Sequence, residues 1–178
     1  MKSPATMWGY AAYAAIPFDG KRHEIIAGDH FVNPATSLHH QQVSRHLQYY
    51  LFRAIELPGL GCVINAPVDV QLSDHDIVQP DLVVIRKANL HIQTPSRVKG
   101  IPDLLIEILS PSNPGHDLKT KRLAYQRCGV PEYWIVDPDE HQILVLTLAN
   151  GQYQETTATD TITFDIPPLL AIDLKQVW

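Results

Sequence analysis

The sequence predicts a mixed α/β fold in which a central sheet is flanked by helices. Short apolar runs rich in β-branched residues recur along the chain and indicate strands. One other segment spaces its apolar residues as a helix does, and a second has the start and stop signals of a helix. The chain has 178 residues, of which 45% are hydrophobic and 19% charged, a composition typical of a folded globular protein. We therefore expect a single domain over residues 1–178, with a loosely ordered leader over residues 1–15 and the core from about residue 22.

The first half of the chain is expected to form a hairpin, a helix and three strands. Gly28-Asp29 separates two short apolar runs, so residues 23–32 should form a hairpin. Thr36 or Ser37 can cap a helix whose apolar residues recur at helical spacing and which Pro58-Gly59 ends. The following strands are expected at residues 62–64, 68–72 and 82–85.

The second half contains the most apolar segment of the chain, residues 103–109, which we expect to be a central strand. A basic loop over residues 86–101 precedes it, and the prolines of residues 110–115 end it. Asp117 can cap a helix over residues 118–128, which Gly129 ends. The last elements are expected to be a strand at residues 133–136 and a hairpin of residues 143–148 and 152–157 around Asn150-Gly151.

Charge is distributed unevenly along the chain. The net charge of −5 resides in residues 139–178, whereas residues 86–127 hold eight bases and three acids. Such a basic segment suits a phosphate-binding surface, although a solvated face of ordinary lysines and arginines would have the same composition. The bases that we expect to engage a nucleic-acid backbone are Arg86, Lys87, Arg97, Lys99, Arg122 and Arg127.

Cysteine use and hydropathy indicate a cytoplasmic protein. The two cysteines, Cys62 and Cys128, lack the spacing of a thiolate zinc site and form no disulfide framework. No stretch reaches the roughly 18 apolar residues that a membrane-spanning helix needs, so we expect no membrane partner.

Two carboxylates lie inside or beside apolar strands, where burial is costly unless a cation compensates it. Asp81 opens the run over residues 82–85, and Glu107 lies within the central strand, facing the side where Asp81 could meet it. Two neighbouring carboxylates of this kind suggest a site for Mg²⁺ or Mn²⁺, although Asp81 could equally be a turn residue. Asp117, Lys121 and Tyr125 share one helix face, either as an ordinary ion-paired face or with Lys121 directed at the carboxylates.

Several segments together resemble a known family. They are PDLVV at residues 80–84, PDLLIEILSPS at residues 102–112, GVPEYWIVDP at residues 129–138, and Asp117, Lys121 and Tyr125 between them. They resemble the Uma-type putative restriction endonuclease family, which is similar to the PD-(D/E)XK nuclease superfamily. The likeness extends from about Glu24 to Trp178 and implies a restriction-endonuclease-like core.

The resemblance implies roles for individual residues. Asp81 would be the first metal-binding aspartate and Glu107 the acidic residue of the second motif, with the main-chain carbonyl of Ile108 a further ligand. Leu109 stands where the superfamily has its lysine, so Lys121 on the next helix would supply the missing cation. The accessory candidates are Glu24, His40, Asp117 and, less directly placed, Lys119.

These residues predict a Mg²⁺-dependent or Mn²⁺-dependent endonuclease that hydrolyses phosphodiester bonds of nucleic acid, with DNA the expected substrate. The missing lysine after Glu107 keeps an alternative open, a catalytically inactive nuclease-like domain that binds nucleic acid or a protein. The acidic segment over residues 139–178 would repel DNA and could instead face a second subunit, as in a homodimer.

Overall fold

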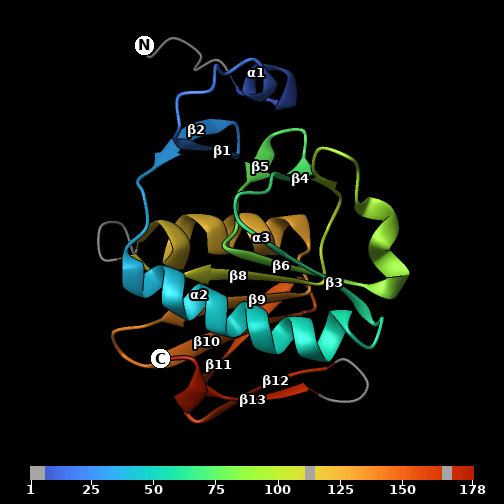
Figure 1. The fold of residues 1–178 in the computed structure, drawn as a ribbon. Helices are drawn as coiled ribbons and strands as arrows, with labels where there is room; N and C mark the ends of the chain where they lie inside the picture. The colour runs from blue at the N-terminus through green and yellow to red at the C-terminus, as the bar shows by residue number, and fades with distance from the viewer. Residues whose placement is uncertain (1–6, 111–114, 166–169) are drawn as a thin grey trace.

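A six-stranded mixed sheet forms the centre of the structure, a computed structural model that describes residues 7–110, 115–165 and 170–178. Its strands, in spatial order, are β11 (Gln152–Ala158), β10 (Gln142–Ala149), β9 (Glu132–Asp137), β8 (Leu104–Ile108), β6 (Leu82–Arg86) and β3 (Gly61–Asn65). Inside this sheet β8 pairs antiparallel with β6 and parallel with β9 (Figure 1). The predicted mixed sheet with a central strand near residues 103–109 is confirmed.

A second sheet of five short strands lies above the first in Figure 1. Its spatial order is β2 (Asp29–Asn33), β1 (Arg22–Ile26), β5 (Asp76–Val78), β4 (Val70–Ser73) and β7 (Val98–Lys99). Separately, β12 (Thr161–Phe164) pairs antiparallel with β13 (Leu170–Asp173), and short 3₁₀ helices cover Lys87–Ile92 and Leu174–Gln176. The predicted hairpins over residues 23–32 and 143–157 are both present, as β1–β2 and β10–β11.

Helices cover both faces of the six-stranded sheet. Ser37 caps α2 (Leu38–Leu51) by accepting a hydrogen bond from the His40 N–H, and the helix continues as a π-helical turn, Phe52–Glu56, ending just before Pro58. On the opposite face, α3 (Arg122–Cys128) follows the π-helical segment His116–Lys121 and ends at Gly129, whose left-handed φ of 81° suits a glycine. None of the described helices is long and apolar enough to cross a membrane.

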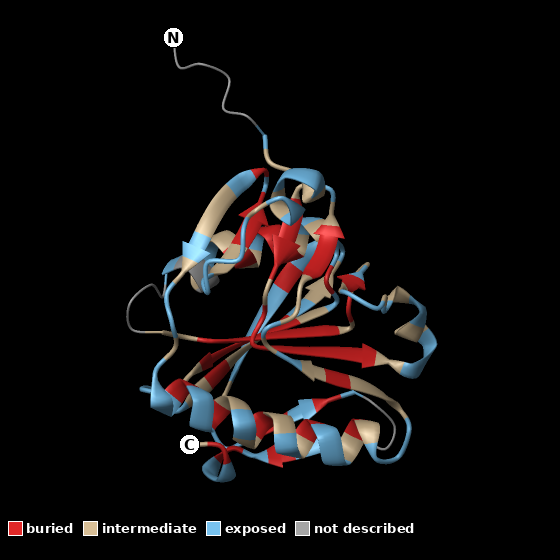
Figure 2. Ribbon diagram, turned by 45° about the horizontal axis from the view of Figure 1, so that its top comes forward, coloured by how far each residue is buried: buried red, intermediate tan, exposed pale blue. Residues whose placement is uncertain are grey.

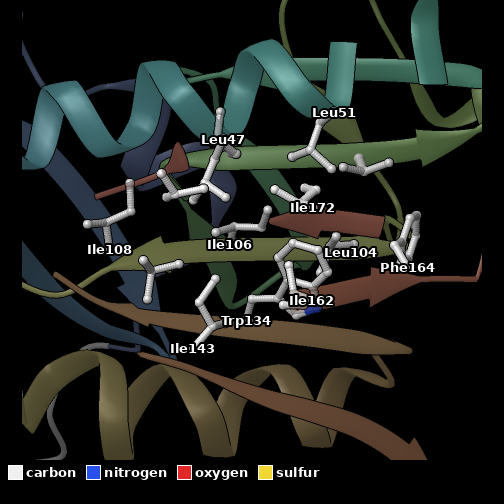
Figure 3. Packing of buried hydrophobic residues seen from close by; sticks show 14 of the residues in the cluster. Leu47, Leu51, Leu104, Ile106, Ile108, Trp134, Ile143, Ile162, Phe164 and Ile172 are labelled. Atoms are coloured by element: carbon white, nitrogen blue, oxygen red, sulfur yellow. The ribbon is translucent and has the colours of Figure 1, made fainter. Parts of the chain in front are cut away.

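Alternating side chains of β8 divide the core into two clusters. Leu104 and Ile106 pack toward Leu47 and Leu51 of α2 (Figure 3), whereas Leu105 packs on the other side with α3. Buried residues concentrate on the central strands, while α2 turns an exposed face outward (Figure 2). Strand alternation therefore directs Glu107 to the α3 side of the sheet, as its position in the sequence predicts.

The structure differs from the sequence-based expectations near the N-terminus. Residues 1–15 are expected to be a loose leader, but Tyr10–Ala14 form the short helix α1. The Trp8 N–H donates to the Gly28 carbonyl, and the Tyr13 hydroxyl donates to Asp69 Oδ1 at 2.6 Å. Residues 1–6 lie outside the described residues, and the ordered part of this segment is held by contacts with residues far along the chain.

Other differences concern short elements. The expected strand at residues 68–72 is shorter and forms a hairpin with β5, and the basic loop over residues 86–101 contains β7 and a 3₁₀ turn. The helix expected over residues 118–128 begins earlier, at His116, so the predicted cap at Asp117 is wrong. Most of the proline-rich segment, residues 111–114, lies outside the described residues.

Truncation of Leu104 should strongly destabilise the fold. Leu104 of β8 is fully buried and packs toward α2. Leu104→Ala therefore leaves a cavity and should lower the free energy of unfolding by about 3 kcal/mol. The matched control is Leu123→Ala on α3. Leu123 is 62% exposed, so this substitution should lower the free energy of unfolding by less than about 0.5 kcal/mol. Urea denaturation measures both, and equal effects would contradict this description of the core.

Candidate active site

Asp81 directly precedes β6 and is 3% exposed. The register that pairs Leu82 with Ile106 places it opposite Glu107 on β8. Its Oδ2 accepts hydrogen bonds from His40 Nε2 and from the Ile108 N–H, each at 2.9 Å. Its Oδ1 accepts from an Arg22 guanidinium nitrogen at 3.1 Å. Both carboxylate oxygens therefore have donors that fix their orientation.

These donors keep Asp81 ionised in spite of its burial. Burial alone would raise the pKa of the carboxyl, but the hydrogen bond and charge of His40, the charge of Arg22 and the Ile108 N–H outweigh it, so the pKa is lowered. For Arg22, burial lowers the pKa, yet the charges of Asp81, Glu107 and Glu24 together raise it. Arg22 thus remains a cation beside three carboxylates.

Glu107 is held by the helix on the other side of the sheet. Its Oε1 accepts hydrogen bonds from Lys121 Nζ at 2.8 Å and from the Tyr125 hydroxyl at 2.7 Å. Burial, followed by the charges of Glu107 and Glu24, raises the pKa of Tyr125 well above its ordinary value, so this hydroxyl stays protonated and donates. Lys121 and Tyr125 lie four residues apart and therefore reach the same carboxylate.

Lys121 joins the two sheets through Glu24. Its Nζ lies 3.1 Å from Glu24 Oε1 as well as 2.8 Å from Glu107, and its side chain is only 2% exposed. Glu24 comes from β1 of the second sheet, is fully buried, and accepts the Gln79 N–H at 2.7 Å. One ammonium group therefore compensates carboxylates from two different sheets.

The charge and donor atoms of this site suit a hard cation. Glu24, Asp81 and Glu107 bring three carboxylates, and they pair with the basic side chains of Lys121 and Arg22. Within the described residues, no group of three or more His, Cys, Asp and Glu side chains has the arrangement of a complete metal site. Carboxylate oxygens are the kind of donor that Mg²⁺ and Mn²⁺ prefer.

The structure brings together most of the acidic and helical candidates. His40 contacts Asp81, and Lys121 contacts both Glu24 and Glu107. Ile108 reaches the group with its N–H, whereas the predicted use of its carbonyl remains a prediction. Lys119 is exposed on the helix surface, and the side chain of Asp117 lies outside what the structure describes.

The basic candidates lie elsewhere, and the arginines among them have partners of their own. Arg86 and Lys87 stand at the end of β6 opposite to Asp81, about 16 Å along the strand. Arg122 pairs with Glu155, and Arg127 pairs with Asp76, both at 2.6 Å. Arg97 lies over the Tyr10 ring and Lys99 is exposed on the edge strand β7. These bases therefore lie apart from the carboxylates, and their expected contact with a nucleic-acid backbone stays a prediction.

Arg22 is a member of the site that the sequence reasoning missed. A signal for it exists, because Arg22 and Glu24 alternate along β1 and so share a face with each other. Arg22 also lines a cavity of about 90 Å³ beside Asp81, together with His40, Arg45 and Asn65. The guanidinium thus connects the buried carboxylates to solvent.

The chain is similar to a family of putative restriction endonucleases in sequence and to a putative nuclease in fold. The model of a family described as "Uma2: Putative restriction endonuclease" matches residues 10–175. A crystal structure at 1.96 Å resolution of "a putative nuclease belonging to DUF820" from Anabaena variabilis ATCC 29413 superposes with a TM-score of 0.77. That likeness covers 98% of this chain and 97% of the other at 18% identity, so it shows the fold alone. No curated protein matches the sequence significantly.

The depressed pKa of Asp81 predicts a pH-dependent effect of its removal. The folded pKa lies below the usual value of 3.8, so the ionised carboxylate stabilises the fold above pH 3.8 and loses this effect as the pH falls through the folded pKa. Asp81→Asn should therefore lower the free energy of unfolding by about 3 kcal/mol at pH 7 and pH 5, and by progressively less below pH 3.8.

Urea denaturation across this pH range measures the difference between the variant and the native protein. Asp139→Asn, at an exposed position, serves as the control and should have little effect at any pH. An Asp81→Asn effect that stays constant or grows on acidification would contradict the assignment.

Proposed function

Because the chain belongs to the Uma2 family of putative restriction endonucleases, we propose that it is a metal-dependent nuclease that hydrolyses phosphodiester bonds, with DNA as its substrate. Family membership and the nuclease-like fold support nuclease function as a class. The observation that carries the finer proposal is the buried pair Asp81 and Glu107 with Lys121 2.8 Å from Glu107. In this proposal these three residues form the catalytic centre.

The donor set favours Mg²⁺ or Mn²⁺ as the metal. Asp81 and Glu107 would hold it, since they lie opposite each other on adjacent strands and offer hard oxygen ligands. Mg²⁺ is usually held by one or two carboxylates and keeps several waters, so a two-carboxylate site suits it better than it suits zinc. Such an ion, when bound, would lower the pKa of a coordinated water and polarise the scissile phosphate.

The protein's own groups would orient the reactants. Lys121 and Tyr125 fix the Glu107 carboxylate, and His40 with the Ile108 N–H fixes that of Asp81. Lys121 would take the role of the superfamily's lysine, whose position Leu109 occupies. Its ammonium lies 2.8 Å from Glu107 and would stabilise the negative charge that develops on the phosphate.

Arg22 is suited to the phosphate itself. Its side chain is 25% exposed, so it can keep Asp81 on one edge of its guanidinium while presenting other N–H groups to a substrate. In this arrangement Arg22 would be the group that first meets the phosphodiester as it approaches the buried carboxylates.

One observation favours a second candidate function, an inactive nuclease-like domain that binds nucleic acid. Lys121 already bridges Glu24 and Glu107, and Arg22 pairs with Asp81, so the carboxylates are compensated without a metal. Such a domain would bind DNA with strong salt dependence and without cleavage.

Supercoiled DNA, linear DNA, single-stranded DNA and RNA should be incubated with the protein in Mg²⁺, in Mn²⁺ and in EDTA. Cleavage of DNA with a divalent ion and none in EDTA is expected, with Glu107→Gln reducing the rate at least a hundredfold. Cutting that survives Glu107→Gln or EDTA would contradict the proposal, and binding without any cutting would favour the inactive domain.

Two neighbouring lysines provide a matched test of the catalytic cation. Lys121→Met should reduce cleavage by about a hundredfold or more, whereas Lys119→Met, at an exposed position two residues away, should leave the rate within about twofold. Circular dichroism of both variants checks that they remain folded. Equal loss in the two variants, or none in Lys121→Met, would remove Lys121 from the catalytic centre.

A further inference from the structure

A groove leads from the surface to Asp81. It encloses about 740 Å³ between the start of β1, the linker from β2 to α2, and the loop at Ala66-Pro67. This linker runs down the left side of the fold in Figure 1. The groove shares Arg22, Gln41 and Ala66 with the 90 Å³ cavity that reaches Asp81. A ligand lying in the groove would therefore meet the candidate catalytic centre at Arg22.

The linings of groove and cavity are basic, although the chain as a whole carries a charge of −5. Lys21 lines the groove, Arg45 lines the cavity and Arg22 lines both, while Asp81 is the one acid among the described lining residues. The Lys21 side chain is 62% exposed, and its ion pair with Asp19 spans 3.6 Å at the surface, where such pairs are weak. Lys21 and the exposed Arg45 are therefore available to an incoming anion.

The remaining walls indicate which part of a nucleic acid would lie there. The described lining residues of both hollows include no Phe, Tyr or Trp, and the groove is walled by Val32, Pro34, Ala35 and Pro67. Bases bound in single-stranded nucleic-acid sites usually stack on aromatic side chains, whereas backbone phosphates need only cations and polar groups. This lining suits a sugar–phosphate chain rather than stacked bases.

We propose that this groove binds the sugar–phosphate backbone of one nucleic-acid strand, with Lys21 and Arg45 contacting phosphates on the two sides of the phosphate that lies at Arg22. The inference rests on the proposed nuclease function and adds the surface on which the substrate lies. None of the bases of residues 86–127 is among the described residues that line the groove or the cavity, so the basic segment is a separate candidate surface. Recognition of this kind is largely independent of base sequence.

Binding of fluorescently labelled single-stranded and duplex oligonucleotides, measured by anisotropy in EDTA over a range of salt, tests the groove. Lys21→Ala and Arg45→Ala should each weaken binding about fivefold and lower the slope of log affinity against log salt by about one. Lys87→Ala probes the rival basic segment, and Lys175→Ala is the exposed control; both should bind as the native protein does.

Loss of binding in Lys87→Ala but not in Lys21→Ala or Arg45→Ala would overturn the inference, as would native protein that binds no oligonucleotide at low salt. Cleavage assayed in parallel separates the two proposals. If the native protein cleaves nucleic acid but Lys21→Ala and Arg45→Ala bind it as tightly as the native protein does, binding in the groove is refuted and the nuclease proposal stands. Native protein that binds through Lys21 and Arg45 but never cleaves would refute the nuclease proposal alone.

Discussion

The ion pairs of Lys121 with Glu24 and Glu107 are the interaction on which the rest of the site depends. Removing carboxylates from water is costly, and here Glu24, Asp81 and Glu107 are all at most 3% exposed. Lys121 compensates two of them, and Arg22 with His40 compensates the third. Lys121 thereby ties β1 and β8 to the helix that carries it, while Arg22 and His40 tie the start of β6 to β1 and α2.

The two hydrophobic clusters make this arrangement rigid. Leu104 and Ile106 hold β8 against α2 on one face, and Leu105 packs with Ala124 and Tyr125 of the Lys121 helix on the other. Strand alternation then leaves Glu107 on the helix side, within reach of both Lys121 and the Tyr125 hydroxyl. The site is therefore positioned by core packing, and the charged groups occupy the edge of the core where the groove at Arg22 reaches it.

Much of this arrangement could be predicted from sequence because its signals are local. The apolar run around Glu107 predicted a central strand, Asn150-Gly151 predicted a hairpin, and helical spacing placed Lys121 on one face with Tyr125. β5 and β7 are too short to leave a pattern, with three and two residues. The ion pairs of Arg127 and Arg122 could not be predicted for a related reason, because their partners Asp76 and Glu155 are 51 and 33 residues away in sequence.

We propose that Asp81 and Glu107 form one metal site, with the Lys121 ammonium beside it. Anomalous diffraction from a crystal soaked in Mn²⁺ tests it without depending on the identity of a substrate. The account predicts an anomalous peak bonded to carboxylate oxygens of both Asp81 and Glu107, with the Lys121 ammonium beside it. A peak elsewhere, or none at a Mn²⁺ concentration that saturates other carboxylate sites in the crystal, would contradict the account.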